Sequence, residues 1–237
     1  MRRIDSIVED VADIYHTSGR DAEEYLYKAR KLKEEYGPGL AVVYCWFYSV
    51  PQKWSQVEPK VFDLMKKANS FDLDEMLAMP VESLASKLKP IIFYNKIALQ
   101  LKRFCETIRA KYGSWGLFCD ILCEENIFSI FKALRRFEDI RLTFKNLAAM
   151  KIFVGLEDNL LILDTHVAKV LGINNKEASK YRVRELLFRS LLTRHDEITE
   201  RLRLRGIDTC MAKWSLAIWF NGAKIKANSL LLSHQPR

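Results

Sequence analysis

Apolar residues recur at helical spacing along most of the 237-residue chain, and this pattern limits the fold more than any other feature. One apolar stripe comprises Ile127, Phe128, Ile130, Phe131, Leu134 and Phe137, and a less strict one comprises Ile97, Leu99, Leu101, Phe104, Cys105 and Ile108. Alternating runs typical of strands extend over no more than a few residues, and the chain has nine glycines and six prolines. The sequence therefore predicts an all-α protein, arranged in two helical lobes.

Two segments, Leu40–Tyr48 and Trp214–Phe220, are apolar on nearly all sides, which is typical of helices buried in the middle of a bundle. A Gly-Pro-Gly stretch at residues 37–39 predicts the start of the first helix, and Pro51 predicts its end, because proline cannot continue the hydrogen-bond ladder. Further helix boundaries are indicated by Pro80, Gly113, Gly155, Gly172 and Gly206.

The charge balance favours a polyanionic partner, since 38 Lys and Arg residues against 30 Asp and Glu residues give a net charge of +8. Nucleic acid is the first candidate, and a solvated basic surface is the alternative. The longest apolar run, Leu40–Tyr48, is far shorter than the roughly 20 residues that cross a membrane. The N-terminus lacks the apolar core of a signal peptide, so we expect a cytoplasmic or nuclear protein without a membrane partner.

The five cysteines are odd in number, and several lie inside apolar helical patterns, which predicts reduced, buried thiols. Cys119 and Cys123 are four residues apart, but no second pair lies nearby. Because a metal site or iron–sulfur cluster needs about four converging ligands, we expect neither a metal nor another cofactor.

The most informative stretch runs from Phe137 to Ile173 and contains Leu-Asp-Thr-His-Val at residues 163–167. This motif resembles the Val-Asp-Thr-His-Val stretch of the helix-hairpin-helix DNA glycosylase superfamily, which includes endonuclease III and the 8-oxoguanine glycosylases. In that superfamily the aspartate assists cleavage of the base–sugar bond, and a lysine about nineteen residues earlier is the nucleophile of strand-cutting members. The resemblance implies these roles for Asp164 and Lys145.

Three further stretches, Tyr44–Trp54, Leu88–Lys96 and Trp214–Gly222, resemble parts of the superfamily in the expected order. The likeness spans roughly residues 36 to 226. It implies a two-lobed helical fold, with a central lobe of residues 36–150 that ends in the hairpin. The second lobe would combine residues 1–35 with residues 151–237.

The chain departs from the superfamily at the hairpin, which is usually Leu-Pro-Gly-x-Gly-x-Lys. The matching stretch, Asp139–Lys145, contains no glycine. Glycines allow a tight turn and a close approach of backbone N–H groups to phosphate. Their absence therefore affects the backbone contacts that the superfamily usually makes with DNA. Arg141 and Thr143 are candidates for replacing it with side-chain contacts. The four-cysteine cluster of endonuclease III is also absent.

The residue types suit the implied reaction. Cleavage of a glycosidic bond places oxocarbenium charge on the sugar, which a carboxylate such as that of Asp164 stabilises. A neutral lysine amine attacks the same carbon and forms a Schiff base, after which the 3′ phosphate is eliminated. The damaged base must first leave the duplex and stack on aromatic or apolar walls.

The implied DNA contacts come from Gln52, Lys53, Tyr94, Lys96, Arg141, Thr143 and His166, with Gln52 filling the gap left by the flipped base. The candidate walls of the base pocket are Trp46, Trp214, Trp219 and Phe220. Each assignment has a simpler alternative. Asp164 fits a helix N-cap, Lys145 fits a surface lysine with Lys151 as the replacement nucleophile, and the aromatic residues fit a core.

These features predict a base-excision glycosylase that acts as a monomer on double-stranded DNA containing a damaged base. Its lysine implies an additional lyase activity at the abasic site. The first substrate prediction is 8-oxoguanine, followed by oxidised pyrimidines. Two other classes stay open: a non-catalytic DNA-binding or protein-binding relative with a degenerate hairpin, and an unrelated basic helical interaction module.

Overall fold

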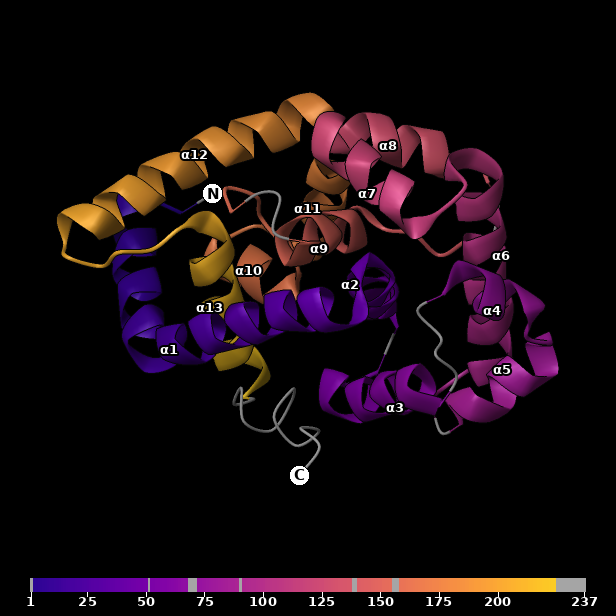
Figure 1. The fold of residues 1–237 in the computed structure, drawn as a ribbon. Helices are drawn as coiled ribbons and strands as arrows, with labels where there is room; N and C mark the ends of the chain where they lie inside the picture. The colour runs from indigo at the N-terminus through magenta and orange to yellow at the C-terminus, as the bar shows by residue number, and fades with distance from the viewer. Residues whose placement is uncertain are drawn as a thin grey trace. The chain divides into compact units, whose positions relative to one another are not determined.

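In a computed structural model of the chain, described for residues 2–50, 52–67, 72–89, 91–137, 140–154 and 158–224, every regular element is a helix. This confirms the all-α prediction (Figure 1). The backbone contacts divide the described residues into two units, one within residues 29–156 and one that combines residues 2–28 with residues 158–224. Helix α1 (Ile4–Tyr36) contributes to both units.

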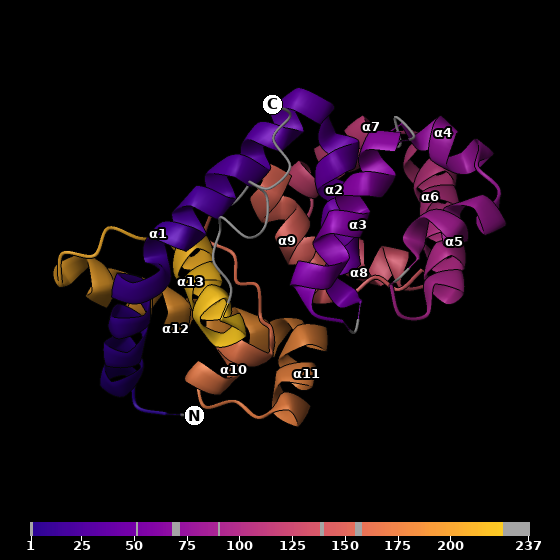
Figure 2. The same cartoon turned by 90° about the horizontal axis from the view of Figure 1, so that it is seen from below.

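The unit of residues 29–156 holds the helices α2 (Pro38–Trp46), α3 (Trp54–Lys67), α4 (Leu73–Ala78), α5 (Val81–Leu88), α6 (Tyr94–Tyr112), α7 (Trp115–Glu124), α8 (Ile127–Leu134) and α9 (Phe144–Val154), with a short 3-10 helix η1 (Phe47–Ser49). Its core lies where α2 packs against α9, with α7 and α8 beside them (Figures 1 and 2). Helices α4 and α5 pack on α6.

Helix α9 is the most enclosed element of this unit, since all its residues except Lys145 are buried. Its last carbonyl groups are covered by the end of α1. There Arg30 donates a hydrogen bond to the carbonyl of Ile152 at 3.3 Å, and Lys33 donates one to that of Val154 at 2.6 Å. Basic side chains at a helix C-terminus donate hydrogen bonds to its unpaired carbonyls, and their positive charge is attracted to the negative end of the helix dipole.

Most predicted helix boundaries agree with the structure. Helix α2 starts at Pro38, and Pro80 directly precedes α5 as its N-cap. Glycines with positive φ follow α6, α10 and α12, namely Gly113, Gly172 and Gly206. The predicted boundaries at Pro51 and Gly155 lie outside the described residues.

Two details of the apolar stripes are wrong. Helix α8 ends at Leu134, so Phe137 lies beyond it and exposes 42% of its surface instead of joining the core. Leu99 is on the outer side of α6 and is 40% exposed. The periodicity continued past the helix end because apolar spacing alone does not indicate where a helix stops.

The other unit holds the first part of α1 and the helices α10 (Thr165–Val170), α11 (Asn175–Val183), α12 (Glu185–Leu204) and α13 (Met211–Ala223). Helix α13 packs against α10 and α12, and α11 packs against α12. As predicted, the segment Trp214–Phe220 is a largely buried helix. The Trp214 indole N–H donates to the Thr199 hydroxyl at 2.9 Å, and that hydroxyl donates to the His195 carbonyl at 2.9 Å.

All five cysteines are free thiols; Cys123 is exposed and the other four are buried, which confirms the main part of the cysteine prediction. Burial raises the pKa of both Cys105 and Cys119 to about 12, so these thiols stay protonated at neutral pH. Among the helices of the described chain, none is both long and apolar enough to cross a bilayer.

The buried ring of His195 gives the first testable prediction. Neither ring nitrogen has a hydrogen-bond partner among the described residues, and the ring packs edge-on against Trp214 with centroids 5.0 Å apart. Burial lowers the pKa of His195 from 6.5 to about 3, with a smaller contribution from Arg194. The unfolded chain therefore binds the proton more tightly, and stability falls as pH drops from about 6.5 toward 3, by at most about 1.4 kcal/mol per pH unit.

We expect His195→Leu to remove this part of the acid sensitivity when the free energy of unfolding is measured by urea denaturation from pH 7 to pH 4. The matched control is His16→Gln on the exposed side of α1, which should keep the slope of the original chain. An unchanged slope in His195→Leu would contradict a buried, neutral His195.

Candidate active site

Lys145, the predicted nucleophile, is the second residue of α9 and lies half-buried at the start of that helix. Its Nζ atom donates a hydrogen bond to the backbone carbonyl of Tyr48 at 2.6 Å. Tyr48 belongs to η1, which directly follows α2. The amine is therefore fixed against the backbone instead of extending freely into solvent. Lys151, the alternative nucleophile, is buried deeper in the same helix.

The start of α9 is set by a reciprocal pair, Thr143 and Asn146. The Thr143 backbone N–H donates to Asn146 Oδ1 at 2.9 Å, and the Asn146 N–H donates to the Thr143 hydroxyl oxygen at 3.3 Å. This arrangement is a capping box in which an asparagine replaces the usual Glu or Gln. The Thr143 hydroxyl also contacts Asn146 Oδ1. The Thr143 side chain, predicted to contact DNA, therefore caps the helix in this structure.

Asn146 also closes the C-terminal end of α2. Its Nδ2 group donates to the carbonyl of Cys45 at 2.7 Å and to that of Trp46 at 2.9 Å, and its side chain is fully buried. In return, the Trp46 indole N–H donates to the carbonyl of Ile140 at 2.9 Å. Helix α9 and the loop that precedes it are therefore joined to α2 by side-chain hydrogen bonds, from Asn146 to α2 and from Trp46 to the loop.

Arg141 adopts the left-handed backbone conformation, with φ of 48°, at the position that the sequence resemblance aligned with the first glycine of the superfamily hairpin. Its guanidinium donates to the Ser49 carbonyl at 2.7 Å, and the Ser49 hydroxyl donates back to the Arg141 carbonyl at 3.3 Å. Burial lowers the pKa of Arg141. Its side chain anchors the loop, so the proposed phosphate contact has to come from the N–H groups that this bond leaves unused.

Asp164, the predicted catalytic carboxylate, is the N-cap residue of α10. Its Oδ1 atom accepts a hydrogen bond from the Val167 N–H at 2.8 Å, and the side chain is buried. This agrees with the simpler interpretation as a helix cap, which is compatible with catalysis. Burial lowers the pKa of Arg182 on α11, and the Asp164 carboxylate partly counteracts this effect. Asp164 and Lys145 belong to different units.

His166 lies two residues after Asp164 and packs closely against α13. A Cβ atom added at Gly222 would lie 2.3 Å from His166 Nδ1, closer than any real contact. Gly222 is therefore needed to admit the half-buried imidazole ring. This close contact holds the His166 ring against α13 and explains the glycine near the end of that helix.

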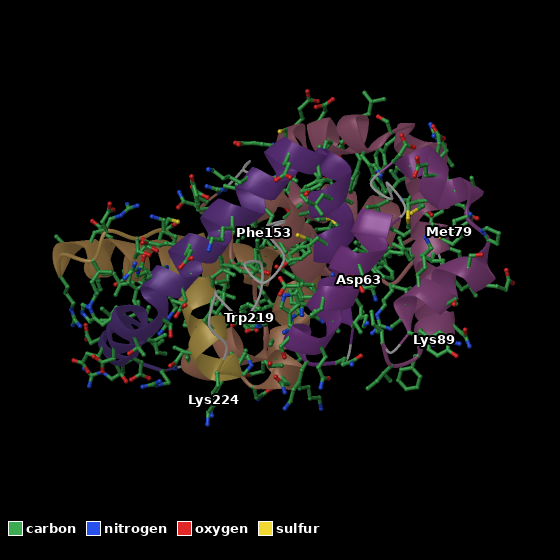
Figure 3. All side chains as sticks on the ribbon, turned by 60° about the horizontal axis from the view of Figure 1, so that its bottom comes forward. Asp63, Met79, Lys89, Phe153, Trp219 and Lys224 are labelled. Carbon is green, nitrogen blue, oxygen red and sulfur yellow. The ribbon has the colours of Figure 1, made fainter. Side chains whose placement is uncertain are left out.

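The remaining predicted DNA contacts lie near the loops that follow η1 and precede α6. Gln52 Oε1 accepts a hydrogen bond from the Ile92 N–H at 2.9 Å, which connects these loops, while its Nε2 donates to Gln56 Oε1 at 3.2 Å. Lys53 and Lys96 are exposed. Tyr94 is half-buried, and the amine of Lys89 (labelled in Figure 3) lies 5.6 Å from the centre of its ring.

The predicted pocket aromatics lie mainly in the cores. Trp46, Trp214 and Phe220 have no exposed surface, so the structure places them as core residues and not as walls open to a base. Trp219 is partly exposed, with its ring 6.0 Å from Tyr25 and 5.0 Å from Phe220 (Figure 3). It is the one member of the four whose surface is available to a ligand in the described structure.

Glu58 is a buried carboxyl group that the sequence analysis missed. It accepts a hydrogen bond from the Tyr44 hydroxyl and is 1% exposed. Burial raises its pKa to about 8, although the bond from Tyr44 lowers it. The Tyr44 ring packs edge-on against Trp54 at 5.1 Å. A signal was present, because Glu58 lies at helical spacing between Trp54 and Val61, on the apolar face of α3.

Comparison with known proteins gives no match to a protein-family model, to curated proteins or to solved structures. Within the described ranges, no three His, Cys, Asp or Glu side chains converge in a way that would hold a metal ion.

The double role of Asn146 gives the second prediction. Asn146→Ala removes the side-chain donor of two buried carbonyls and the acceptor of the Thr143 N–H, and we expect it to lower the free energy of unfolding by about 3 kcal/mol. Thr143→Ala, which loses the hydroxyl cap, should cost about 1 kcal/mol. The matched control Asn95→Ala, at an exposed position of α6, should change stability by less than about 0.5 kcal/mol in the same urea denaturation. Equal losses in Asn146→Ala and Asn95→Ala would contradict the hydrogen-bond assignment.

Glu58 gives the third prediction, which has the opposite sign from that of His195. Because its folded pKa of about 8 lies above the ordinary 4.5, its protonated form stabilises the fold below pH 4.5. This contribution is lost as pH rises to about 8, by at most about 1.4 kcal/mol per pH unit. Glu58→Gln keeps the shape and should flatten the dependence of unfolding free energy on pH between 5 and 8. Glu106→Gln, at an exposed site, should leave it unchanged.

Proposed function

We propose that this chain is a helix-hairpin-helix DNA glycosylase that removes a damaged base from double-stranded DNA and then cuts the strand as a lyase. The observation that carries the proposal is the position of the Lys145 amine, 2.6 Å from the Tyr48 carbonyl at the start of α9. The second support is Arg141, whose φ of 48° gives a left-handed turn at the position that the resemblance aligns with the first hairpin glycine.

In the proposed reaction, the Lys145 amine attacks C1′ of the damaged nucleoside. The C1′–N bond breaks, and its electron pair leaves with the base, which takes up a proton. Opening of the sugar ring gives a Schiff base between Lys145 and C1′. Loss of a proton from C2′ then expels the 3′ phosphate by cleavage of the C3′–O bond. A neutral amine can donate one N–H to Tyr48 and still direct its lone pair at the sugar.

Asp164 would stabilise the positive charge that develops on the sugar. As an N-cap, it uses Oδ1 for the Val167 N–H and keeps Oδ2 for a second interaction. The helix fixes the direction of the carboxylate before substrate binds. Capping and catalysis are compatible because they call on different oxygen atoms.

The proposed substrate class is oxidised bases, with 8-oxoguanine first and oxidised pyrimidines next. The proposed architecture is the two-lobed one, with residues 36–150 forming the central lobe, and the proposed active form is a monomer that needs no cofactor. A degenerate relative that binds DNA or protein without cutting is the alternative. It is favoured by the internal bonds of the Arg141 and Thr143 side chains, which replace the open hairpin grip.

The fourth prediction tests the chemistry by borohydride trapping of the full chain on duplexes that carry one 8-oxoguanine, one oxidised pyrimidine or one abasic site. We expect a covalent adduct that disappears in Lys145→Ala and persists in Lys169→Ala, an exposed lysine of α10. Asp164→Asn keeps a good helix cap and should slow base release by at least about 100-fold, whereas Asp208→Asn at an exposed site should not.

The outcomes separate the alternatives. Base release that survives Lys145→Ala but not Asp164→Asn would indicate a glycosylase without lyase activity. Absence of both adduct and base release on oxidised, deaminated and alkylated duplexes would overturn the enzyme and favour the binding protein.

A further inference from the structure

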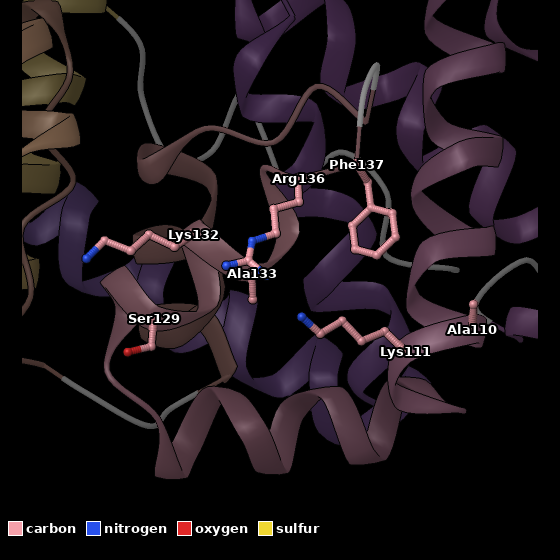
Figure 4. Close-up of a pocket in the computed structure, with 7 residues that line it drawn as sticks. All are labelled: Ala110, Lys111, Ser129, Lys132, Ala133, Arg136 and Phe137. Atoms are coloured by element: carbon pink, nitrogen blue, oxygen red, sulfur yellow. The ribbon is translucent and has the colours of Figure 1, made fainter.

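A second feature of residues 29–156 lies away from the contacts of Lys145. An open cavity of about 510 Å³ lies between the end of α6, helix α8 and the turn that follows α8 (Figure 4). Its lining residues are Ala110, Lys111, Ser129, Lys132, Ala133, Arg136 and Phe137. Its volume is within the range of about 300–1,000 Å³ that is typical of small-molecule sites.

Among the described residues, the lining carries three basic side chains and no acidic one. Lys111 and Arg136 reach toward the same space from different elements, as Figure 4 shows. Both side chains are exposed, and neither forms an ion pair with a described residue. Two converging cations repel each other, so the arrangement favours an anion between them. Glu138 and Asp139, next along the chain, lie outside the described residues.

Phe137 adds an aromatic surface to this charge. The residue is 42% exposed, and it borders the same cavity (Figure 4). A solvated basic patch explains the lysines, since Lys111 and Lys132 complement the C-terminal ends of α6 and α8. It explains neither the hollow nor an exposed phenylalanine within it. An aromatic face beside cations is the combination that binds a nucleotide with an unpaired base.

We propose that this cavity binds one nucleotide of a single-stranded nucleic acid, with its base stacked on Phe137 and its phosphate between Lys111 and Arg136. The site is expected to bind all bases without sequence preference, because every base offers a flat face for stacking. It is independent of the reaction proposed for Lys145 and would hold an unpaired strand even if that reaction does not occur.

The fifth prediction concerns binding of a fluorescent oligothymidylate to the full chain, measured by anisotropy over a series of salt concentrations. We expect the double variant Lys111→Gln with Arg136→Gln to bind at least about tenfold more weakly and to lose about one unit of the slope of log K against log salt. Phe137→Ala should weaken binding about tenfold without changing that slope, because stacking is not ionic.

The matched control removes two exposed charges elsewhere, with Lys176→Gln and Lys180→Gln on α11. It should weaken binding less than twofold. A control that weakens binding as much as the cavity variant would overturn the proposal, because it would assign binding to overall charge. An unchanged affinity in Phe137→Ala would also overturn it. The oligothymidylate carries no damaged base and the measurement needs no covalent adduct, so the outcome does not depend on the trapping experiment.

Two further measurements locate the ligand and identify its source. Ultraviolet crosslinking with an oligonucleotide that contains 5-iodouracil, followed by mass spectrometry of peptides, should mark the peptide of Phe137; crosslinks confined to other peptides would overturn the site. Thymidine monophosphate should compete better than inorganic phosphate. Equal competition by phosphate would reduce the cavity to a plain anion site, and equal affinity for a blunt duplex would exclude recognition of an unpaired base.

Discussion

The carbonyl groups at the end of α2 and in η1 determine how the unit of residues 29–156 is held together. A helix end leaves carbonyls without partners, and burying them unpaired is costly. Here they accept hydrogen bonds from three side chains of one short segment, Arg141, Lys145 and Asn146. The segment that carries the candidate nucleophile is therefore the one that closes α2. The position of Lys145 follows from core packing and not from a flexible loop.

This dependence explains how Arg141, a residue with a long side chain, can adopt a left-handed backbone conformation. A left-handed conformation costs a residue with a side chain about 1–2 kcal/mol. At Arg141 the cost is offset by two hydrogen bonds with Ser49, one from the guanidinium and one to the carbonyl. A glycine would adopt the turn without strain but would lose the guanidinium anchor. Arg141 thus forms the turn with its backbone and anchors it with its side chain. The turn therefore lacks the open backbone surface that a glycine would present to a phosphate.

The sequence predicted the helices and their caps because these depend on neighbours a few residues away. Helical spacing identified α13, and the rules for N-caps identified Asp164. Asn146 escaped notice because its partners lie about 100 residues earlier in the chain. Local patterns also indicate that an aromatic residue is apolar without showing what covers it. Trp46 was therefore assigned to a pocket, although its indole N–H is bonded within the core.

The bond between Lys145 and Tyr48 constrains the proposed chemistry in a further way. A carbonyl acceptor stabilises the ammonium form, whereas attack on C1′ needs a neutral amine. The protein must therefore supply a compensating effect. In the proposed reaction, exclusion of water by bound DNA would act in that direction, since desolvation penalises the charged form. The hydrogen bond to Tyr48 would meanwhile hold the amine in a fixed direction for attack.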